Sequence, residues 1–178
     1  ESNLICPIEE VSSKEEYAAY TIRKKINGIR DKYLKKYQRE KLQNKAELKL
    51  EIKDLKFVDD LDQYLSEMEF NQKISYDNYF KGGYQQAKDK LEDFIENKLQ
   101  HYAEKRNIPH LNFQSDLSPY LHFGQISAQE AASAVLNCEY EAEDFLEELI
   151  VRRELAVNFV YYNQNYDGSL KDILYDWA

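Results

Sequence analysis

Apolar residues recur with the spacing of an α-helix face in two long stretches of this sequence. In the first stretch they fall at i, i+3, i+4, i+8 and i+11, and they are Leu91, Phe94, Ile95, Leu99 and Tyr102. In the second stretch, from about Glu141 to Tyr162, the predicted apolar face consists of Phe145, Leu149, Ala156 and Val160, with Leu146 and Ile150 beside it. The 178 residues include only 5 Gly and 3 Pro, too few for the many turns of a sandwich or barrel. The sequence therefore predicts an all-α fold.

Capping signals predict where two shorter helices begin. Ser118 followed by Pro119 is typical of a helix start, with the serine as the cap and the proline in the first helical position, and this helix should end around Gly124. Ser127 with Glu130 three residues later is typical of a capping box and opens the next helix.

The N-terminal part is predicted as a short extended segment at residues 1–11, followed by a helix. Ser12 or Ser13 is the expected cap, with Glu15 or Glu16 as its capping-box partner, and Gly28 is expected to break or kink the helix. Residues 31–54 are highly charged and poorly amphipathic. Helical spacing returns at Leu61, Tyr64, Leu65 and Met68, and the loss of periodicity over residues 69–83 predicts a loop.

Charge is distributed unevenly along the chain. The net charge is −9, but the segment 23–56 holds 13 Lys and Arg against 5 Asp and Glu, a net of +8. We call this segment the basic block. A basic block on an acidic protein is one mark of a nucleic-acid surface, and the alternative is a solvated helix face that carries both charges.

The segment from Arg106 to Gln129 is the first candidate for a functional site. Ser115, Leu117 and Ser118 precede or form a helix N-terminus, where backbone N–H groups and the helix dipole favour a phosphate or pyrophosphate. The alternative is an ordinary structural cap.

Glu148 is the second candidate, because it borders the apolar face of the predicted long helix. Burial tunes a carboxylate in that position, which can then hydrogen-bond a substrate. The alternative is an ordinary i, i+4 ion pair with Arg152. Arg106 and Arg153 are placed to reach phosphates or are surface charges.

Other classes of protein find little support in the sequence. No apolar run approaches the roughly 20 residues of a membrane span. Cys6 and Cys138 match no disulfide framework, and no spacing of His or Cys indicates a metal site. The chain begins with Glu1 and without a signal peptide, so we expect a piece of a longer, cytoplasmic protein.

Several motifs together resemble the class II cyclobutane pyrimidine dimer photolyases. The first long motif is Leu117-Ser118-Pro119-Tyr120-Leu121-His122-Phe123-Gly124, which continues to Gln129. The second is Phe145-Leu146-Glu147-Glu148-Leu149-Ile150-Val151-Arg152-Arg153, which continues to Ala156, together with Asn158-Phe159. Shorter ones are Lys14–Ala19 with Thr21-Ile22-Arg23, Arg106-Asn107 with Pro109, Tyr161-Tyr162-Asn163, Asn165-Tyr166-Asp167 and Asp176-Trp177-Ala178. The resemblance is scattered over nearly the whole chain and is dense from Tyr102 onward.

The resemblance implies a fold and a division into segments. The family has an N-terminal α/β antenna domain followed by an all-helical FAD domain, and this chain resembles the connection between them plus the first half of the helical domain. Residues 1–11 are then the end of the interdomain segment. Residues 12–81 are a linker and helical segment with the basic block, and residues 82–178 are the N-terminal half of the FAD-binding domain.

The resemblance also implies an activity, which is DNA repair by light-driven electron transfer from reduced FAD to a flipped-out pyrimidine dimer. Glu148 matches the carboxylate that hydrogen-bonds the dimer and stabilises its radical anion. Arg106, Arg152 and Arg153 match positions that face the DNA. Tyr102, Ser115, Asp116, Leu117 and Ser118 match the segments that hold the phosphates and ribityl chain of FAD. No metal is implied, and the intact enzyme is expected to be a monomer.

Two departures and two alternatives accompany the resemblance. Val157 replaces the family's usual Asp, and Gln164 its usual Pro. The residues around the isoalloxazine ring belong to the family's second half, so we expect this piece alone to bind FAD weakly and not to repair DNA. The alternatives are a cryptochrome-like flavin photoreceptor and a non-catalytic helical DNA-binding module that uses the basic block.

Overall fold

The fold is given by a computed structural model, which describes residues 3–34, 63, 66–67 and 81–168. All regular structure in these residues is helical, and they contain no strand, which confirms the predicted all-α class. Residues 38–81 form a unit of their own, in which Ser66 Oγ donates a hydrogen bond to the carbonyl oxygen of Gln63 at 2.7 Å. The predicted spacing from Leu61 to Met68 falls mostly outside the described residues, as do Lys35–Lys56 of the basic block. The predicted segment boundaries at residues 11 and 81 stay a prediction.

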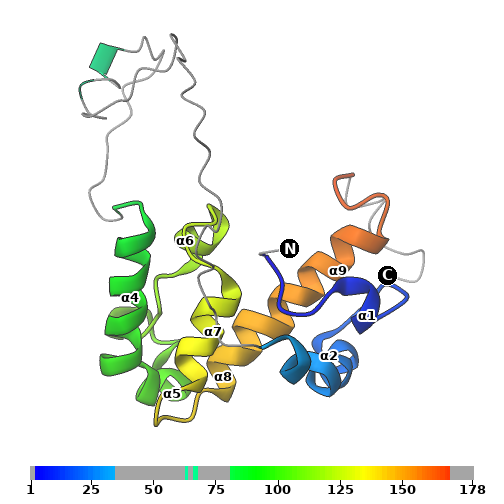
Figure 1. The fold of residues 1–178 in the computed structure, drawn as a ribbon, viewed down its shortest axis with the longest axis horizontal. Coiled ribbons are helices and arrows are strands. Elements are labelled where there is room, and N and C mark those ends of the chain that lie inside the picture. The colour runs from blue at the N-terminus through cyan, green and yellow to red at the C-terminus, as the bar shows by residue number, and fades with distance from the viewer. Residues whose placement is uncertain (1–2, 35–62, 64–65, 68–80, 169–178) are drawn as a thin grey trace, which may run out of the picture. The chain divides into compact units, whose positions relative to one another are not determined.

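The other unit holds the helices of Figure 1. In chain order they are α1 (Ile8–Val11), α2 (Ala19–Tyr33), α4 (Tyr84–Asn97), the 3₁₀ turn η1 (Leu99–His101), α5 (Tyr102–Lys105), the 3₁₀ turn η2 (Pro109–Leu111), α6 (Ser118–His122), α7 (Ala128–Leu136), α8 (Glu143–Leu146), the π-helical turn η3 (Glu147–Arg152) and α9 (Arg153–Tyr162).

The core is built around one phenylalanine of α4. Phe94 is fully buried, and its ring centroid lies 5.4 Å from that of Tyr102 and 4.7 Å from that of Phe145. Leu91 and Leu99 are buried with it, so the predicted apolar face of residues 91–102 is confirmed, with a break in the α-helix at Lys98. This aromatic cluster packs α4 and α5 against α8, which leads directly into the helical turn that carries Glu148.

Two predicted caps have different outcomes. Ser127 caps α7 as expected, because its Oγ accepts a hydrogen bond from the N–H of Glu130 at 3.0 Å. Ser118 is the first residue of α6, so Leu117 occupies the cap position, one residue earlier than predicted. The end of α6 is as predicted: Gly124 adopts a φ of +64°, a left-handed conformation that suits glycine.

The N-terminal prediction was wrong in two places. The expected extended segment contains α1, and the helix predicted from Ser12 begins only at Ala19. Gly28 lies inside α2 and does not break the helix. Ser12 does not cap a helix, because its Oγ donates to Glu16 Oε1 at 2.7 Å. Side chains of α9 form hydrogen bonds with backbone groups of residues 12–16 instead. These partners are distant in sequence, so no local pattern predicts them.

The predicted long helix is present, but it contains a π turn. Helices α8, η3 and α9 follow one another without a break from Glu143 to Tyr162. In an uninterrupted α-helix, the buried line through Leu146 and Ile150 would continue at residues 153 and 157. A π turn adds one residue, and the buried line instead continues at Glu154 and Asn158. For the same reason Ala156 and Val160 are exposed, and their predicted place on the apolar face was wrong.

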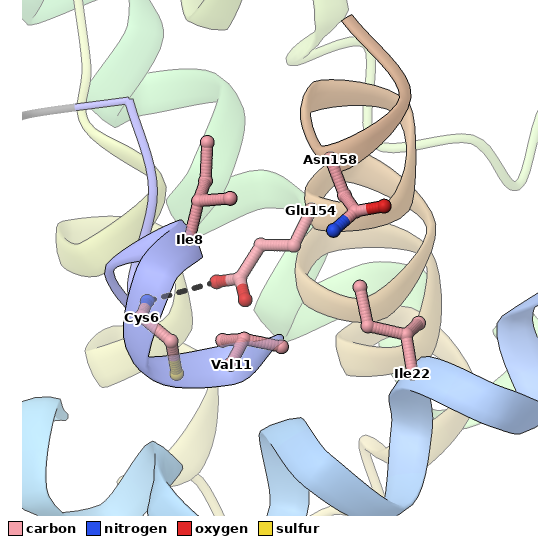
Figure 2. Close-up of a pocket in the computed structure, with 6 residues that line it drawn as sticks. All are labelled: Cys6, Ile8, Val11, Ile22, Glu154 and Asn158. Atoms are coloured by element: carbon pink, nitrogen blue, oxygen red, sulfur yellow. Dashed lines mark hydrogen bonds between the residues drawn. The ribbon is translucent and has the colours of Figure 1, made fainter. Parts of the chain in front are cut away.

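Polar side chains of α9 hold the segment 3–16 against the core. Glu154 Oε1 accepts hydrogen bonds from the N–H groups of Ile5 and Cys6, both at 3.0 Å, as Figure 2 shows for Cys6. Asn158 accepts from the N–H of Glu16 at 2.7 Å and donates to the carbonyl oxygen of Lys14 at 3.2 Å. We call this segment the N-terminal strap.

Glu154 predicts a pH dependence of stability. The carboxyl group is buried, its Oε2 has no hydrogen-bond partner, and burial raises its pKa above the ordinary value. A raised pKa in the folded state means that the stabilisation is complete below the unfolded-state pKa and is lost as the pH rises through the folded-state pKa. Glu154→Gln keeps the acceptor and is always neutral. We therefore expect the free energy of unfolding of the wild type to fall relative to that of Glu154→Gln as the pH rises, by at most about 1.4 kcal/mol per pH unit, the limit for one proton.

Chemical denaturation of both proteins at matched pH values from 4 to 8 measures this difference, and other titrating groups cancel in the comparison. One of them is Glu16, where burial alone would raise the pKa but hydrogen bonds from Lys25, Ser12 and Thr21 lower it to about 2. A difference between the two proteins that does not change with pH would show that the pKa of Glu154 is the same in the folded and unfolded states, and would contradict this prediction.

Candidate functional site

The centre of the candidate site is an ion pair between Glu148 and Arg106. Glu148 lies in η3 and Arg106 directly follows α5, and Arg106 Nη1 donates to Glu148 Oε1 at 2.8 Å. The carboxylate side chain is 40% exposed and the guanidinium side chain 23%. The hydrogen bond to Glu148 raises the pKa of Arg106. The predicted alternative, an ion pair of Glu148 with Arg152, is not the one formed.

Aromatic packing positions Arg106 for this pair. The guanidinium carbon lies 5.5 Å from the centroid of the Tyr102 ring, which is in turn fixed by Phe94 and Phe145. A cation over an aromatic face is attracted by the ring quadrupole. The buried side of the site is therefore closely packed. The partly exposed side presents the Glu148 carboxylate next to the Arg106 guanidinium group.

A second charged group lies one residue earlier on η3. Arg23 of α2 donates to both carboxylate oxygens of Glu147, from Nε at 2.9 Å and from Nη2 at 2.6 Å. Arg152 approaches the same carboxylate, with Nε 3.5 Å from Oε1. The hydrogen bonds from Arg23 lower the pKa of Glu147. Arg152 is 56% exposed and keeps one side open to solvent.

Arg153, the third arginine expected to face DNA, contacts the N-terminal strap. Its Nε donates to the carbonyl oxygen of Asn3 at 3.0 Å and its Nη2 to Asn3 Oδ1 at 2.7 Å. Burial lowers its pKa below the ordinary value for arginine. Structurally, Arg153 thus belongs with Glu154 and Asn158, whereas Arg106, Glu148 and Arg152 lie around η3.

The candidate cofactor residues are the loop 115–118 before and at the start of α6 and the buried side chain of Tyr102. Asp116 has a φ of +57°, and its carboxylate lies 3.6 Å from Lys90 Nζ and 3.9 Å from Lys98 Nζ. Ser115 Oγ accepts from the N–H of Leu117 at 3.4 Å, which fixes the turn before α6. Ser118 is exposed, whereas Leu117 and Tyr102 are buried. The loop therefore offers hydroxyl groups near two lysines, and Leu117 and Tyr102 belong to the same hydrophobic core cluster.

The described part of the basic block is largely paired with acidic residues. Arg23 binds Glu147, Lys25 binds Glu16, Arg30 lies 3.4 Å from Glu143, and Lys32 lies 2.8 Å from Glu10. Four of the five basic residues within residues 23–34 are thus paired with acidic residues elsewhere in the chain. This arrangement favours the reading of α2 as a structural helix that carries both charges.

Neither a membrane helix nor a metal cluster is found in the described part of the chain. Each helix there is too short or too polar to cross a bilayer. Among the same residues, no three His, Cys, Asp or Glu side chains gather in a way that could hold a metal ion.

Comparison with known proteins gives a consistent family. No protein-family model matches the chain. A deoxyribodipyrimidine photo-lyase of Methanothermobacter thermautotrophicus is 37% identical over 178 residues, which are 100% of this chain and 38% of that protein. One of Arabidopsis thaliana is 38% identical over 98% of this chain and 36% of that protein, and one of Potorous tridactylus is 32% identical over 98% and 32%. The chain is homologous to one part of a photolyase.

The match confirms the resemblance but not the class within the family. The chain spans about a third of the length of the curated relatives it matches, and all candidate site residues lie inside the match because the alignment with one relative covers the whole chain. The assignment to class II stays a prediction. Of the two departures, Val157 is half-buried in α9 of this photolyase part and Gln164 is exposed beyond its end.

Sequence reasoning missed two residues beside the candidate site, Glu147 and Arg23. They are 124 positions apart, so no helical spacing connects them. The only local signal was that Glu147 and Glu148 are adjacent acidic residues. Adjacent residues on a helix face different directions, so the two carboxylates are expected to have different partners.

Proposed function

We propose that the protein containing this chain is a DNA-repair photolyase of class II, which splits cyclobutane pyrimidine dimers by light-driven electron transfer from reduced FAD. The similarity to deoxyribodipyrimidine photo-lyases along the whole chain supports this function. The single observation that carries the proposal is the half-exposed pair of Glu148 and Arg106 on a rigid aromatic base. A cytoplasmic location and a monomeric state are part of the same proposal.

The roles of the charged residues follow from their chemistry. Glu148 forms a hydrogen bond with the base edge of the dimer, a contact that gains strength when the dimer takes up negative charge. Arg106 and Arg152 meet phosphates beside the lesion, because planar guanidinium groups suit phosphate oxygens. The dimer must leave the duplex to reach Glu148, and the distorted pairing of a lesion makes this flipping easier. Arg153 would reach DNA only by releasing Asn3 of the N-terminal strap.

The loop at Ser115–Ser118 fits the phosphate end of a flavin dinucleotide. Lys90 and Lys98 provide positive charge within 3.9 Å of the Asp116 carboxylate, and the hydroxyl groups of Ser115 and Ser118 provide hydrogen bonds. Because Asp116 already shares the two lysines, it orients them and limits the net positive charge there. Leu117 and Tyr102 hold the loop to the core. FAD, when bound, supplies the electron that splits the dimer and receives it back.

The test is to purify the full-length protein that carries this chain and to record its near-UV and visible absorbance. The protein is then illuminated with blue light in the presence of dimer-containing DNA. Flavin absorbance together with loss of dimers is the expected result. Bound flavin without loss of dimers would replace the proposal with a cryptochrome-like photoreceptor, and absence of flavin would contradict both.

A further inference from the structure

The π turn separates two residues that an α-helix would bring together. Glu148 and Arg152 stand four positions apart, the spacing at which opposite charges pair on an α-helix. In the structure, Glu148 pairs with Arg106 at 2.8 Å, and Arg152 approaches Glu147, five positions before it, at 3.5 Å. Five positions is the spacing of the backbone hydrogen bonds in a π-helix. The turn therefore directs each arginine to a different carboxylate.

Glu147 is held in place from outside its own helix. Arg23 binds both of its carboxylate oxygens, and such a two-point contact fixes orientation as well as distance. Helix α2 is itself anchored, because Ile22 and Ile26 on either side of Arg23 are buried in the core. The carboxylate is 21% exposed, less than that of Glu148 at 40%. Arg23 thus ties the start of the π turn to a rigid neighbouring helix.

The distribution of charge shows what this contact achieves. Arg23, Glu147 and Arg152 together carry one net positive charge, whereas Glu148 and Arg106 are balanced. If Glu147 lost its charge or its position, Glu148 would be the nearest remaining carboxylate on the same helix for Arg152. A second arginine at Glu148 would occupy the oxygen atoms that the substrate needs.

We propose that Arg23 and Glu147 are a positioning pair for the candidate site: they keep Arg152 at Glu147 and so reserve Glu148 for Arg106 and the substrate. This inference rests on the proposed function, since it assigns a role beside the same carboxylate. Neither residue touches the substrate, and both act through the π turn and Arg152.

The test uses Arg23→Met and Glu147→Gln in the full-length protein. We expect dimers split per absorbed photon at saturating DNA to fall about 10- to 100-fold in both, as for a misplaced catalytic group, while affinity for undamaged DNA stays within about 2-fold. Arg23→Lys keeps the charge without the two-point contact and should show an intermediate loss. Lys88→Met, which removes an exposed ion pair with Glu92 on α4, is the matched control and should change nothing.

The Glu147→Gln variant separates positioning from direct contact with DNA. It leaves Arg23 in place and removes a negative charge, so a DNA-contact role for Arg23 would leave repair intact and strengthen DNA binding. That result would overturn the inference. Repair unaffected in both variants but lost in Glu148→Ala would also overturn it, and would leave the proposed function standing.

A second readout does not depend on repair. Hydrogen exchange of the backbone amides of residues 147–152 should be about 3- to 10-fold faster in Arg23→Met and Glu147→Gln than in the wild type and Lys88→Met. If the wild type did not split dimers, the proposed function would fail, and this measurement would decide the positioning role alone. Unchanged exchange would overturn it, and faster exchange would support it.

Discussion

Replacing Glu148 with alanine should lower the number of dimers split per absorbed photon by a factor of roughly 10 to 100. A hydrogen bond that involves a charged group contributes about 1.5–3 kcal/mol, and each 1.4 kcal/mol corresponds to a factor of about ten in rate. Glu148→Gln should retain part of the activity, because the amide still hydrogen-bonds a base edge. The measurement is dimer loss under blue light at saturating DNA, with the flavin absorbance of each variant recorded beforehand.

Glu143→Ala is the matched control for this prediction. Glu143 begins the same continuous helix, is 72% exposed and lies 3.4 Å from Arg30, so its loss removes an acidic residue without touching the site. Glu148→Ala also leaves Arg106 without its carboxylate, which costs little in stability because both side chains reach solvent. Equal activity of the wild type and Glu148→Ala would remove Glu148 from the reaction.

Replacing Asn158 with alanine should lower the free energy of unfolding by about 2–4 kcal/mol, because it leaves the buried N–H of Glu16 and the part-buried carbonyl oxygen of Lys14 without partners. Asn158 is 1% exposed, and its side chain is the hydrogen-bond partner of the Glu16 N–H and the Lys14 carbonyl oxygen. The N-terminal strap should loosen together with the loss of stability. Chemical denaturation measures the first effect, and hydrogen exchange of residues 5–16 measures the second.

Asn97→Ala provides the comparison. Asn97 is exposed and donates one hydrogen bond to Asp93 within α4, so its loss should cost no more than about 0.5 kcal/mol. Asn158→Asp keeps the acceptor for Glu16 and loses the donor for Lys14, and it should fall between the two. If Asn158→Ala cost no more than Asn97→Ala, the strap would not depend on α9.

Local signals in the sequence predicted local structure well. The cap at Ser127 needs only the N–H of Glu130 three residues away, and the apolar face around Phe94 needs only helical spacing. The prediction of a cap at Ser12 was wrong because the groups that bind this segment are distant in sequence. Tyr162 donates to the Ser12 carbonyl oxygen, and Asn158 takes the N–H of Glu16, from 150 and 142 positions away.

The candidate site was predictable in part for a similar reason. Motif resemblance singled out Glu148, Arg106 and Arg152, which the structure brings together around η3. Helical spacing, in contrast, suggested Arg152 as the structural partner of Glu148, and this was wrong because a count of four residues assumes a regular α-helix. Arg23 and Glu147 lie within two of the motifs, but nothing in the sequence connects them, since their contact depends on how α2 packs against η3.

The single extra residue of η3 determines which face of α9 points toward the core. One residue corresponds to about 100° of rotation on an α-helix. Deleting one residue from the turn would therefore swing the inward face of α9 by that angle and turn Glu154 and Asn158 away from the N-terminal strap. It would also restore the alignment of Glu148 with Arg152. The docking of the strap and the choice of partner for Glu148 thus both depend on the same rotation of the helix.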